Sequence, residues 1–274
     1  MREGLLKKNL KKFMEILLKE TRKRREFIKE AFLWGRIFEG VKNKKKILLK
    51  PNIVSYEEYP TTTHPETIKE CLKLLLEIKK REEIVVADGP AFDAGDSDKI
   101  IQNHPIKKVC DDFGVLCLNL NKLPKKKIEI EGYSFSIPEI IFEFDYIISL
   151  PVLKTHRVCK ITGAFKNQYG FLAPKKKLYY HLPFKNINKA IVLLNKVKKV
   201  DFFIVDAIKT LIFAQEKRHG GKERDLGYML AGKDPFELDK AGFLLLKKID
   251  PSLAKIKEKD VPQFIWAKKL WINI

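Results

Sequence analysis

The chain of 274 residues contains few cysteines, and they form no cluster motif. Its four cysteines, Cys71, Cys110, Cys117 and Cys159, show no Cys-x-x-Cys spacing, so neither an iron–sulfur nor a zinc motif is present. A disulfide framework is not expected, because a chain of this length buries an ample core without covalent links. We expect buried free thiols. Cys159 is the candidate for a reactive thiol, because neighbouring cations would lower its pKa if it were exposed.

Long apolar runs are also missing. No run approaches the roughly 18 residues that cross a membrane. The start of the chain does not resemble a signal peptide, because its basic residues are interspersed with short apolar groups. We therefore expect a cytoplasmic protein. Internal repeats and Ser/Gly-rich linkers are absent too, which favours one main domain with an N-terminal extension.

Acidic residues are scarce: 35 Asp and Glu face 55 Lys and Arg, a net charge of +20. Residues 1–50 alone carry 17 Lys or Arg and 6 Asp or Glu. Apolar residues recur there at helical spacing on both sides of the basic cluster 22–25, at Leu6, Leu10, Phe13 and Leu17 and then at Phe27, Ala31, Trp34 and Phe38.

This pattern predicts a basic amphipathic helical arm over residues 1–44. Such an arm either docks to an anionic membrane surface or a nucleic acid, or covers the domain with its apolar face. A Lys- and Glu-rich composition is also typical of thermophilic proteins, so charge alone does not indicate nucleic acid.

Residues 45–274 alternate between strand and helix patterns. Strand signals fall at 46–54, 83–88, 115–121, 146–153, 201–208 and 226–231, and helical patterns fall at 65–80, 98–113, 183–198 and 235–248. The alternation predicts an α/β domain: a mixed, mostly parallel sheet with helices on both faces. Residues 127–137 alternate with period two around Glu131-Gly132, which predicts a small hairpin.

The most informative stretch is 149–171, SLPVLKTHRVCKITGAFKNQYGF. A strand pattern leads into a polar segment that carries Lys154, His156, Lys166 and Asn167. Open α/β sheets bind ligands at the carboxyl ends of their strands, and backbone amides at a helix start after Thr162-Gly163 can add donors. The segment therefore favours an anionic or carbonyl-bearing small ligand. The alternative is a solvated basic loop.

Polar residues follow other predicted strands as well. Lys50 and Asn52 lie just past one strand, while Asp88 and Asp206 each end another. These carboxylates could be general bases, metal ligands or ion-pair partners that orient the lysines, and the sequence leaves the three alternatives open.

Helix starts account for several further polar residues. Thr63-x-x-Glu66 with Pro65 fits a capping box, and Asp234-Pro235-x-Glu237 fits the same device. His64 is not required by such a box and is a candidate ligand contact at an exposed helix start. Asp239 either faces the pocket or caps a neighbouring turn.

The 149–171 stretch resembles the signature of the family called domain of unknown function 362 (DUF362), which reads lPxLKTH and then TGAxKNxxG. Further elements occur in family order at 50–54 (KPNxV), 62–66 (TTHPE), 205–208 (DAI) and 230–239 (lAgxDPxALD). The family has no settled activity. We predict that Lys154, His156 and Lys166 are catalytic and that the ligand is bound by Lys50, Asn52, His64, Asp88, Asn167, Asp206 and Asp239.

Three departures from the family pattern matter. Residues 87–91, ADGPA, lack the hydroxyl of the family's GDSPG-like turn. Residues 213–221, FAQEKRHGG, replace a glycine-rich turn, and only Gly220-Gly221 could do a similar job. The ferredoxin-like module of many relatives is missing.

Two classes of function remain open at this stage. As an enzyme, the chain would abstract a proton next to a carbonyl or carboxylate, with His156 titrating near neutrality and a lysine ammonium holding the anion. It is loosely similar to the lactate racemase family, in which His and Lys residues handle a hydroxy acid and a nickel-bearing cofactor. The relatives' iron–sulfur modules imply redox chemistry, which would require an external electron carrier. The alternative is a non-catalytic binding protein for an anionic metabolite or cofactor. The sequence identifies no cofactor or metal for either class.

Overall fold

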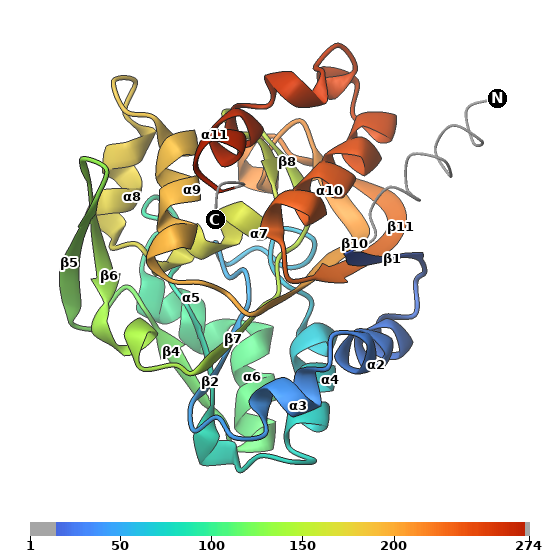
Figure 1. Ribbon diagram of the computed structural model, residues 1–274, viewed down its shortest axis with the longest axis vertical. Helices are drawn as coiled ribbons and strands as arrows, with labels where there is room; N and C mark the ends of the chain where they lie inside the picture. The colour runs from blue at the N-terminus through green and yellow to red at the C-terminus, as the bar shows by residue number, and fades with distance from the viewer. Residues whose placement is uncertain (1–14, 272–274) are drawn as a thin grey trace.

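A seven-stranded sheet forms the centre of the computed structural model, which describes residues 15–271 (Figure 1). In spatial order its strands are β1 (Ile16–Glu20), β11 (Lys222–Gly232), β10 (Phe202–Ile212), β7 (Tyr146–Ser149), β2 (Ile47–Lys50), β3 (Ile84–Asp88) and β4 (Leu116–Asn119). Neighbours from β10 to β4 run parallel, whereas β11 is antiparallel to both β10 and β1. The predicted mixed, mostly parallel sheet is confirmed.

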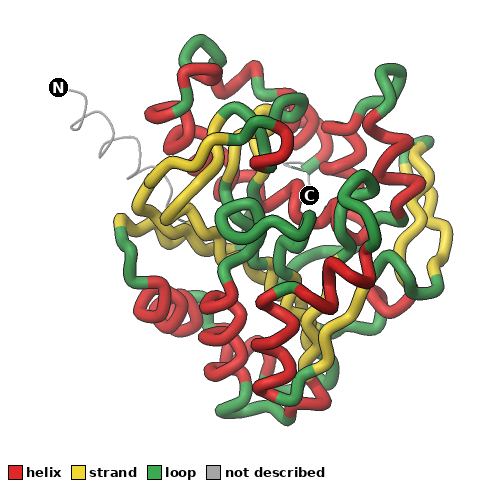
Figure 2. Tube along the Cα trace, turned by 180° about the vertical axis from the view of Figure 1, so that it is seen from behind, coloured by secondary structure: helices red, strands yellow, loops and turns green. Residues whose placement is uncertain are grey.

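Two hydrophobic cores lie on opposite faces of this sheet, because successive side chains of a strand point in opposite directions. In β2, Leu48 belongs to one core, and Ile47 and Leu49 belong to the other. The core around Ile47 is covered by α2 (Arg24–Trp34), α3 (Ile37–Val41), α4 (Pro65–Leu75), α5 (Ser97–Asn103) and α6 (Pro105–Phe113). The core around Leu48 is covered by α7 (Ala164–Asn167), α8 (Pro174–His181), α9 (Ile187–Val197), α10 (Pro235–Ile249) and α11 (Pro262–Leu270). Helices therefore lie on both faces, as Figure 2 shows from behind.

The order of the strands reverses beside β2. The chain runs outward from β2 to β3 and β4 and then returns to β7, on the other side of β2. In open α/β sheets such a reversal leaves a crevice outside the carboxyl ends of the strands. Here that edge is marked by Lys50, Asp88 and Ser149, the last residues of β2, β3 and β7.

Local sequence features explain the smaller elements. The predicted hairpin is confirmed as β5 (Lys125–Ile130) and β6 (Tyr133–Pro138). Its two turn residues, Glu131 and Gly132, both have positive φ, as a tight two-residue turn requires. The helical pattern over 98–113 is two helices, because Pro105 disfavours a helical conformation in the residue before it. His104 is accordingly extended, and its Nδ1 accepts the Ile106 amide at 3.2 Å.

The segment predicted as a helical arm, residues 1–44, differs in its described part. Leu17 lies in strand β1, which pairs with β11 from Ile16 opposite Gly232 to Glu20 opposite Tyr228. Without β1, strand β11 would be an edge strand with unpaired backbone N–H and C=O groups. Hydrogen bonding to these groups outweighs the helical spacing of the side chains in residues 16–20. Residues 1–14, which include Leu6, Leu10 and Phe13, lie outside the described residues.

Helix α2 packs on the domain and does not form a separate arm. Phe27 and Ala31 are buried in the same core as Ile47, so the apolar face of this helix is part of the domain. Arg24, one of the basic cluster 22–25, is buried. Its Nε donates to Asp206 Oδ2 at 2.9 Å and its Nη1 to Glu66 Oε2 at 2.9 Å, which ties α2 to β10 and α4.

Replacing Arg24 with alanine should lower the free energy of unfolding by about 3–5 kcal/mol, because it leaves the buried Asp206 carboxylate without its charged partner. The matched control is Arg25→Ala, one residue along the helix. The Arg25 side chain is 74% exposed and its Nε lies 3.7 Å from Glu70, so this change should cost under about 1 kcal/mol. Urea titrations of both variants measure the difference. Equal losses would show that Arg24 does not hold α2 to the sheet.

Candidate functional site

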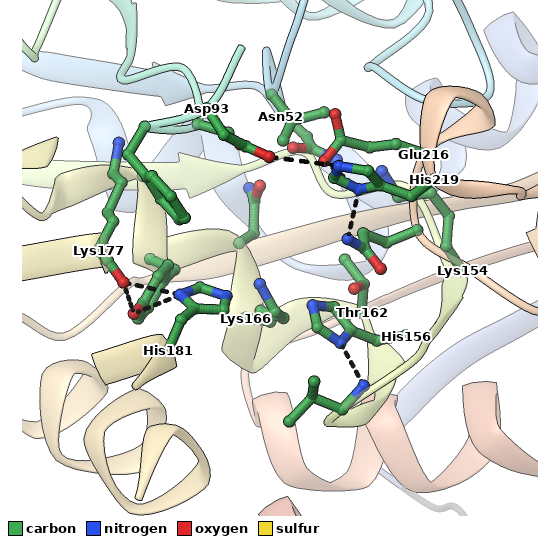
Figure 3. Close-up of a pocket in the computed structure, with 18 of the residues that line it drawn as sticks. Asn52, Asp93, Lys154, His156, Thr162, Lys166, Lys177, His181, Glu216 and His219 are labelled. Atoms are coloured by element: carbon green, nitrogen blue, oxygen red, sulfur yellow. Dashed lines mark hydrogen bonds and ion pairs between the residues drawn. The ribbon is translucent and has the colours of Figure 1, made fainter. Parts of the chain in front are cut away.

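A cavity of about 390 Å³ opens at the carboxyl edge of the sheet, at the reversal beside β2 (Figure 3). Of the ten residues that the sequence nominates, six line it: Asn52, Asp88, Lys154, His156, Lys166 and Asn167. Lys50 lies against it through an ion pair with Asp88. His64, Asp206 and Asp239 do not line it.

The segment expected as a polar loop is a short, buried hairpin. Strand β8 (Lys154–His156) pairs with β9 (Lys160–Thr162), with Lys154 opposite Thr162. Because side chains alternate along a strand, Lys154, His156 and Thr162 share the face that lines the cavity, while Ile161 enters the core. Lys154 and His156 are 1% and 3% exposed, which rules out the alternative of a solvated loop.

Lys154 is a buried lysine with a perturbed acidity. Its Nζ donates to the Thr61 carbonyl, and no carboxylate within residues 15–271 forms an ion pair with it. Burial disfavours the ammonium form and lowers the pKa of Lys154 to about 7. Lys154 therefore exchanges a proton near neutral pH.

His156 is held in one tautomer. Its Nδ1 accepts the amides of Val158 and Cys159, both at 3.1 Å, so the ring proton of the neutral imidazole is on Nε2. Burial, reinforced by the positive charge of Lys166, places the pKa of His156 well below its usual range. The expectation that this imidazole titrates near neutrality is wrong: His156 is a neutral Nε2–H donor, whereas Lys154 beside it has a pKa of about 7.

Two further polar groups face the cavity without a protein partner. Lys166 Nζ lies 4.9 Å from the centre of the Tyr169 ring, has no hydrogen-bond or ion-pair partner in the described part of the chain, and has a pKa lowered by burial. Thr162 Oγ1 is buried, and it too has no hydrogen-bond partner among residues 15–271. Buried polar atoms are normally hydrogen-bonded, so these groups favour a polar ligand or water in the cavity.

A buried ion pair forms the floor of the site. Lys50 Nζ donates to Asp88 Oδ1 at 2.6 Å, and Asp88 Oδ2 accepts the Ile53 amide at 2.6 Å. Gly170 lies so close that a Cβ atom there would be 2.1 Å from Asp88 Oδ1. Of the three alternatives for Asp88, its contacts support an ion-pair partner, although the lysine it holds is Lys50.

The two asparagines join the loops around this floor. Asn167 Nδ2 donates to Ser149 Oγ at 2.8 Å and to the Lys50 carbonyl at 3.3 Å. The backbone N–H of Asn52 donates to Thr63 Oγ1 at 2.8 Å. Both residues line the cavity, so each combines a structural contact with access to a ligand.

Three nominated residues have structural partners elsewhere. His64 caps α4, with Nδ1 accepting the Glu66 amide at 3.1 Å. The expected cap, Thr63, instead donates its hydroxyl to the Leu150 carbonyl at 2.6 Å. Asp206 accepts hydrogen bonds from Arg24 and from the Tyr59 hydroxyl at 2.8 Å.

The Asp239 carboxylate binds the backbone amides at the start of α7, which were expected to bind an anionic ligand. It accepts the amides of Ala164 at 2.6 Å and Phe165 at 3.1 Å. Gly163 permits this approach, because a Cβ atom there would lie 2.2 Å from Asp239 Oδ1. Asp234 caps α10 as predicted and accepts the Phe236 amide.

Sequence analysis missed the wall contributed by residues 213–221. Gln215, Glu216 and His219 line the cavity there. Glu57 holds this wall by accepting the amides of Lys217 at 2.8 Å and Arg218 at 2.7 Å. The run of polar residues at 215–219, QEKRH, was the available signal. The resemblance to a glycine-rich turn instead favoured Gly220-Gly221.

Helix α8 supplies two more missed residues, Lys177 and His181. Lys177 Nζ donates to the carbonyls of Gly89 and Pro90 at 2.7 and 2.9 Å, which anchors α8 to the loop after β3. Burial lowers the pKa of Lys177 to about 7. Their spacing of four residues in a helical pattern was the available signal.

The structure also describes the surroundings of the Cys159 thiol and of the acidic side chains. Cys159 is fully buried, and burial raises its pKa to about 11, so it is not an activated thiol. Within residues 15–271 no group of three or more His, Cys, Asp or Glu side chains is placed to hold a metal ion. None of the helices in this range is long and apolar enough to cross a lipid bilayer.

Comparison with known proteins gives one family match. The model of the family described as domain of unknown function (DUF362) matches residues 47–243. A thylakoid-associated protein of Synechocystis is 26% identical over 221 residues, covering 75% of this chain and 64% of that protein. The chain thus spans less than two thirds of that relative's length.

Solved structures share the fold at low sequence identity. The lactate racemase apoprotein from Thermoanaerobacterium thermosaccharolyticum superposes with a TM-score of 0.53 at 14% identity, covering 80% of this chain and 54% of that one. A protein from Thermotoga maritima superposes with a TM-score of 0.54 at 14% identity, covering 84% and 60%. These likenesses establish a common α/β fold.

Replacing His156 with alanine should cost about 1–3 kcal/mol of stability, because the buried amides of Val158 and Cys159 lose their acceptor. His156→Asn should cost less, because its side-chain oxygen can take the place of Nδ1 while the Nε2–H is removed. Thermal melts of the two variants give the comparison. Two equally destabilised variants would show that the amide contacts do not set the ring's position.

Proposed function

We propose that this chain, which belongs to the DUF362 family, is an enzyme that moves a proton next to the carbonyl group of a small anionic metabolite. The observation that carries the proposal is a set of cavity groups that have no carboxylate partner among residues 15–271. Lys154 and Lys166, two lysines with lowered pKa values, face it beside the neutral Nε2–H donor of His156.

The charge balance of the cavity favours an anion. Its lining includes three carboxylates, and each pairs with a basic residue other than Lys154 or Lys166. Asp88 pairs with Lys50, and both Asp93 and Glu216 pair with Arg218. The positive charge of the two lysines is therefore left for a ligand, because a buried charge is costly unless it is paired.

The chemistry assigns a separate role to each group. Lys154 is the base: with a pKa of about 7, a large fraction of its amine is neutral near pH 7 and can take a proton from the carbon next to a carbonyl. The Nε2–H of His156 donates to the carbonyl oxygen as negative charge develops there. Lys166 holds the carboxylate of the substrate. The proton on Lys154 then returns to the same carbon, so that atoms and charge balance.

The fold neighbour named lactate racemase acts, by its name, on a small hydroxy acid. At 14% identity this likeness concerns the fold, and it guides only our choice of probes. Small 2-oxo acids, which are anions, match both the positively charged cavity and the proposed proton transfer.

Hydrogen–deuterium exchange tests the reaction directly. Wild-type protein in D₂O should exchange the C3 protons of pyruvate or 2-oxobutyrate, followed by proton NMR. Lys154→Met should slow this exchange about 100-fold or more, which is the usual contribution of a general base. The control is Lys196→Met, a lysine outside the cavity. Binding of both acids without exchange by the wild type would leave a binding protein and overturn the catalytic role.

The pH profile gives an independent check. The pH dependence of kcat/KM reports the pKa values of groups in the free enzyme. The ratio should therefore rise with pH, with a midpoint near 7, as Lys154 loses its proton. It should fall again at higher pH as Lys166 loses the charge that holds the carboxylate. In Lys154→Met the limb near pH 7 should disappear from any residual rate. A limb that persists in this variant belongs to another group and would rule out Lys154 as the base.

A further inference from the structure

Exposed apolar side chains gather on α8 and on the loop that follows it. We call Leu178, Tyr179, Leu182 and Phe184 the α8 patch; all four are exposed, and the Phe184 side chain is 91% exposed. In Figure 1 this segment lies at the periphery of the molecule, beside the β5–β6 hairpin. Single exposed apolar side chains are common, but several gathered on one surface point to a partner.

The geometry of α8 directs these residues outward. Leu178, Tyr179 and Leu182 share one helical face, because residues three or four apart are neighbours on a helix. Lys177 and Tyr180 are buried, and they hold the other face against the domain. The exposed face, which is polar in an ordinary surface helix, here combines these three apolar side chains with Lys175.

Lysines surround the patch. Lys175 and Lys185 are exposed, Lys176 is partly exposed, and none of the three has an ion-pair partner in the described chain. Lys176 and Lys185 lie over the Tyr179 ring, with Nζ 5.3 and 4.7 Å from its centre.

Acidic groups near the patch are few. Glu129 and Glu131 of the neighbouring hairpin pair with Lys127 and Lys189. The sequence from residue 146 to residue 200 contains no Asp or Glu but 12 Lys or Arg. The patch therefore presents apolar side chains within a positive field.

We infer that the α8 patch docks onto an anionic lipid surface. The apolar side chains enter the boundary between headgroups and acyl chains, and the lysines contact lipid phosphates. A second copy of the chain fits less well, because a two-fold interface through this patch would bring its lysines close to their own copies. A nucleic acid supplies phosphates but no apolar layer for Leu178 and Leu182.

Docking in this way places the cavity beside the membrane. Helix α8 also carries His181, which lines the cavity, and the rings of His181 and Phe92 at the rim are 5.6 Å apart. The inference does not depend on the proposed reaction, because vesicles alone test it.

Co-sedimentation of the full chain with vesicles is the experiment. The wild type should bind vesicles of phosphatidylcholine with 30% phosphatidylglycerol, should bind pure phosphatidylcholine about tenfold more weakly, and should be released by salt. Leu182→Ser/Phe184→Ser should weaken binding to the anionic vesicles about tenfold or more. Lys175→Gln/Lys176→Gln/Lys185→Gln should do the same.

Matched controls separate this surface from general effects. Leu33→Ser/Ile78→Ser removes two exposed apolar side chains from the opposite face of the sheet, and Lys255→Gln/Lys257→Gln/Lys259→Gln removes the same charge elsewhere. Both should bind like the wild type. The inference is overturned if the wild type binds neither vesicle, or if the patch variants bind as tightly as these controls. It is also overturned if the serine variant halves the native mass in sizing experiments, which would identify a dimer interface.

Discussion

The buried ion pair between Lys50 and Asp88 is the interaction on which the site depends. Its two residues end adjacent parallel strands, β2 and β3, and neither side chain is more than 3% exposed. Isolated burial of either charge would be prohibitive, so each fixes the other. Asp88 also holds the Ile53 and Gly89 amides, and Gly170 packs against the pair because it has no side chain. Three loops are thereby brought to one point, and the cavity is the space that they leave.

Ion pairs of this kind also decide the charge of the cavity. Asp88 pairs with Lys50, and Arg218 pairs with both Asp93 and Glu216. What is left facing the ligand is a set of donors with different properties. Lys154 has a pKa near neutrality, while His156 is kept neutral by burial and by two backbone amides. The division of labour between them follows from burial and hydrogen bonding, and residue type alone would assign it the other way round.

Much of the fold follows from the sequence, and part of the site does as well. The apolar runs before Lys50, Asp88 and Ser149 predict parallel strands and therefore a common edge. What escapes prediction depends on partners distant in sequence. Asp239 binds the amides of α7, some 75 residues earlier in the chain, and Arg24 binds Asp206 across 182 residues. Neither pairing has a local signature. Strand β1 was misread because the edge that it joins lies more than 200 residues away.

Burial of Lys154 links ligand binding to proton uptake. In the empty cavity this lysine is partly deprotonated near pH 7, whereas an anion beside it favours the ammonium form. A ligand that enters as an anion therefore draws part of a proton from solution. The heat of binding measured in a calorimeter will contain the ionisation enthalpy of the buffer multiplied by that fraction. The heats measured in phosphate and in Tris will therefore differ by the same fraction of the difference between the two ionisation enthalpies. The cavity thus takes up a fraction of a proton with each anion that it binds.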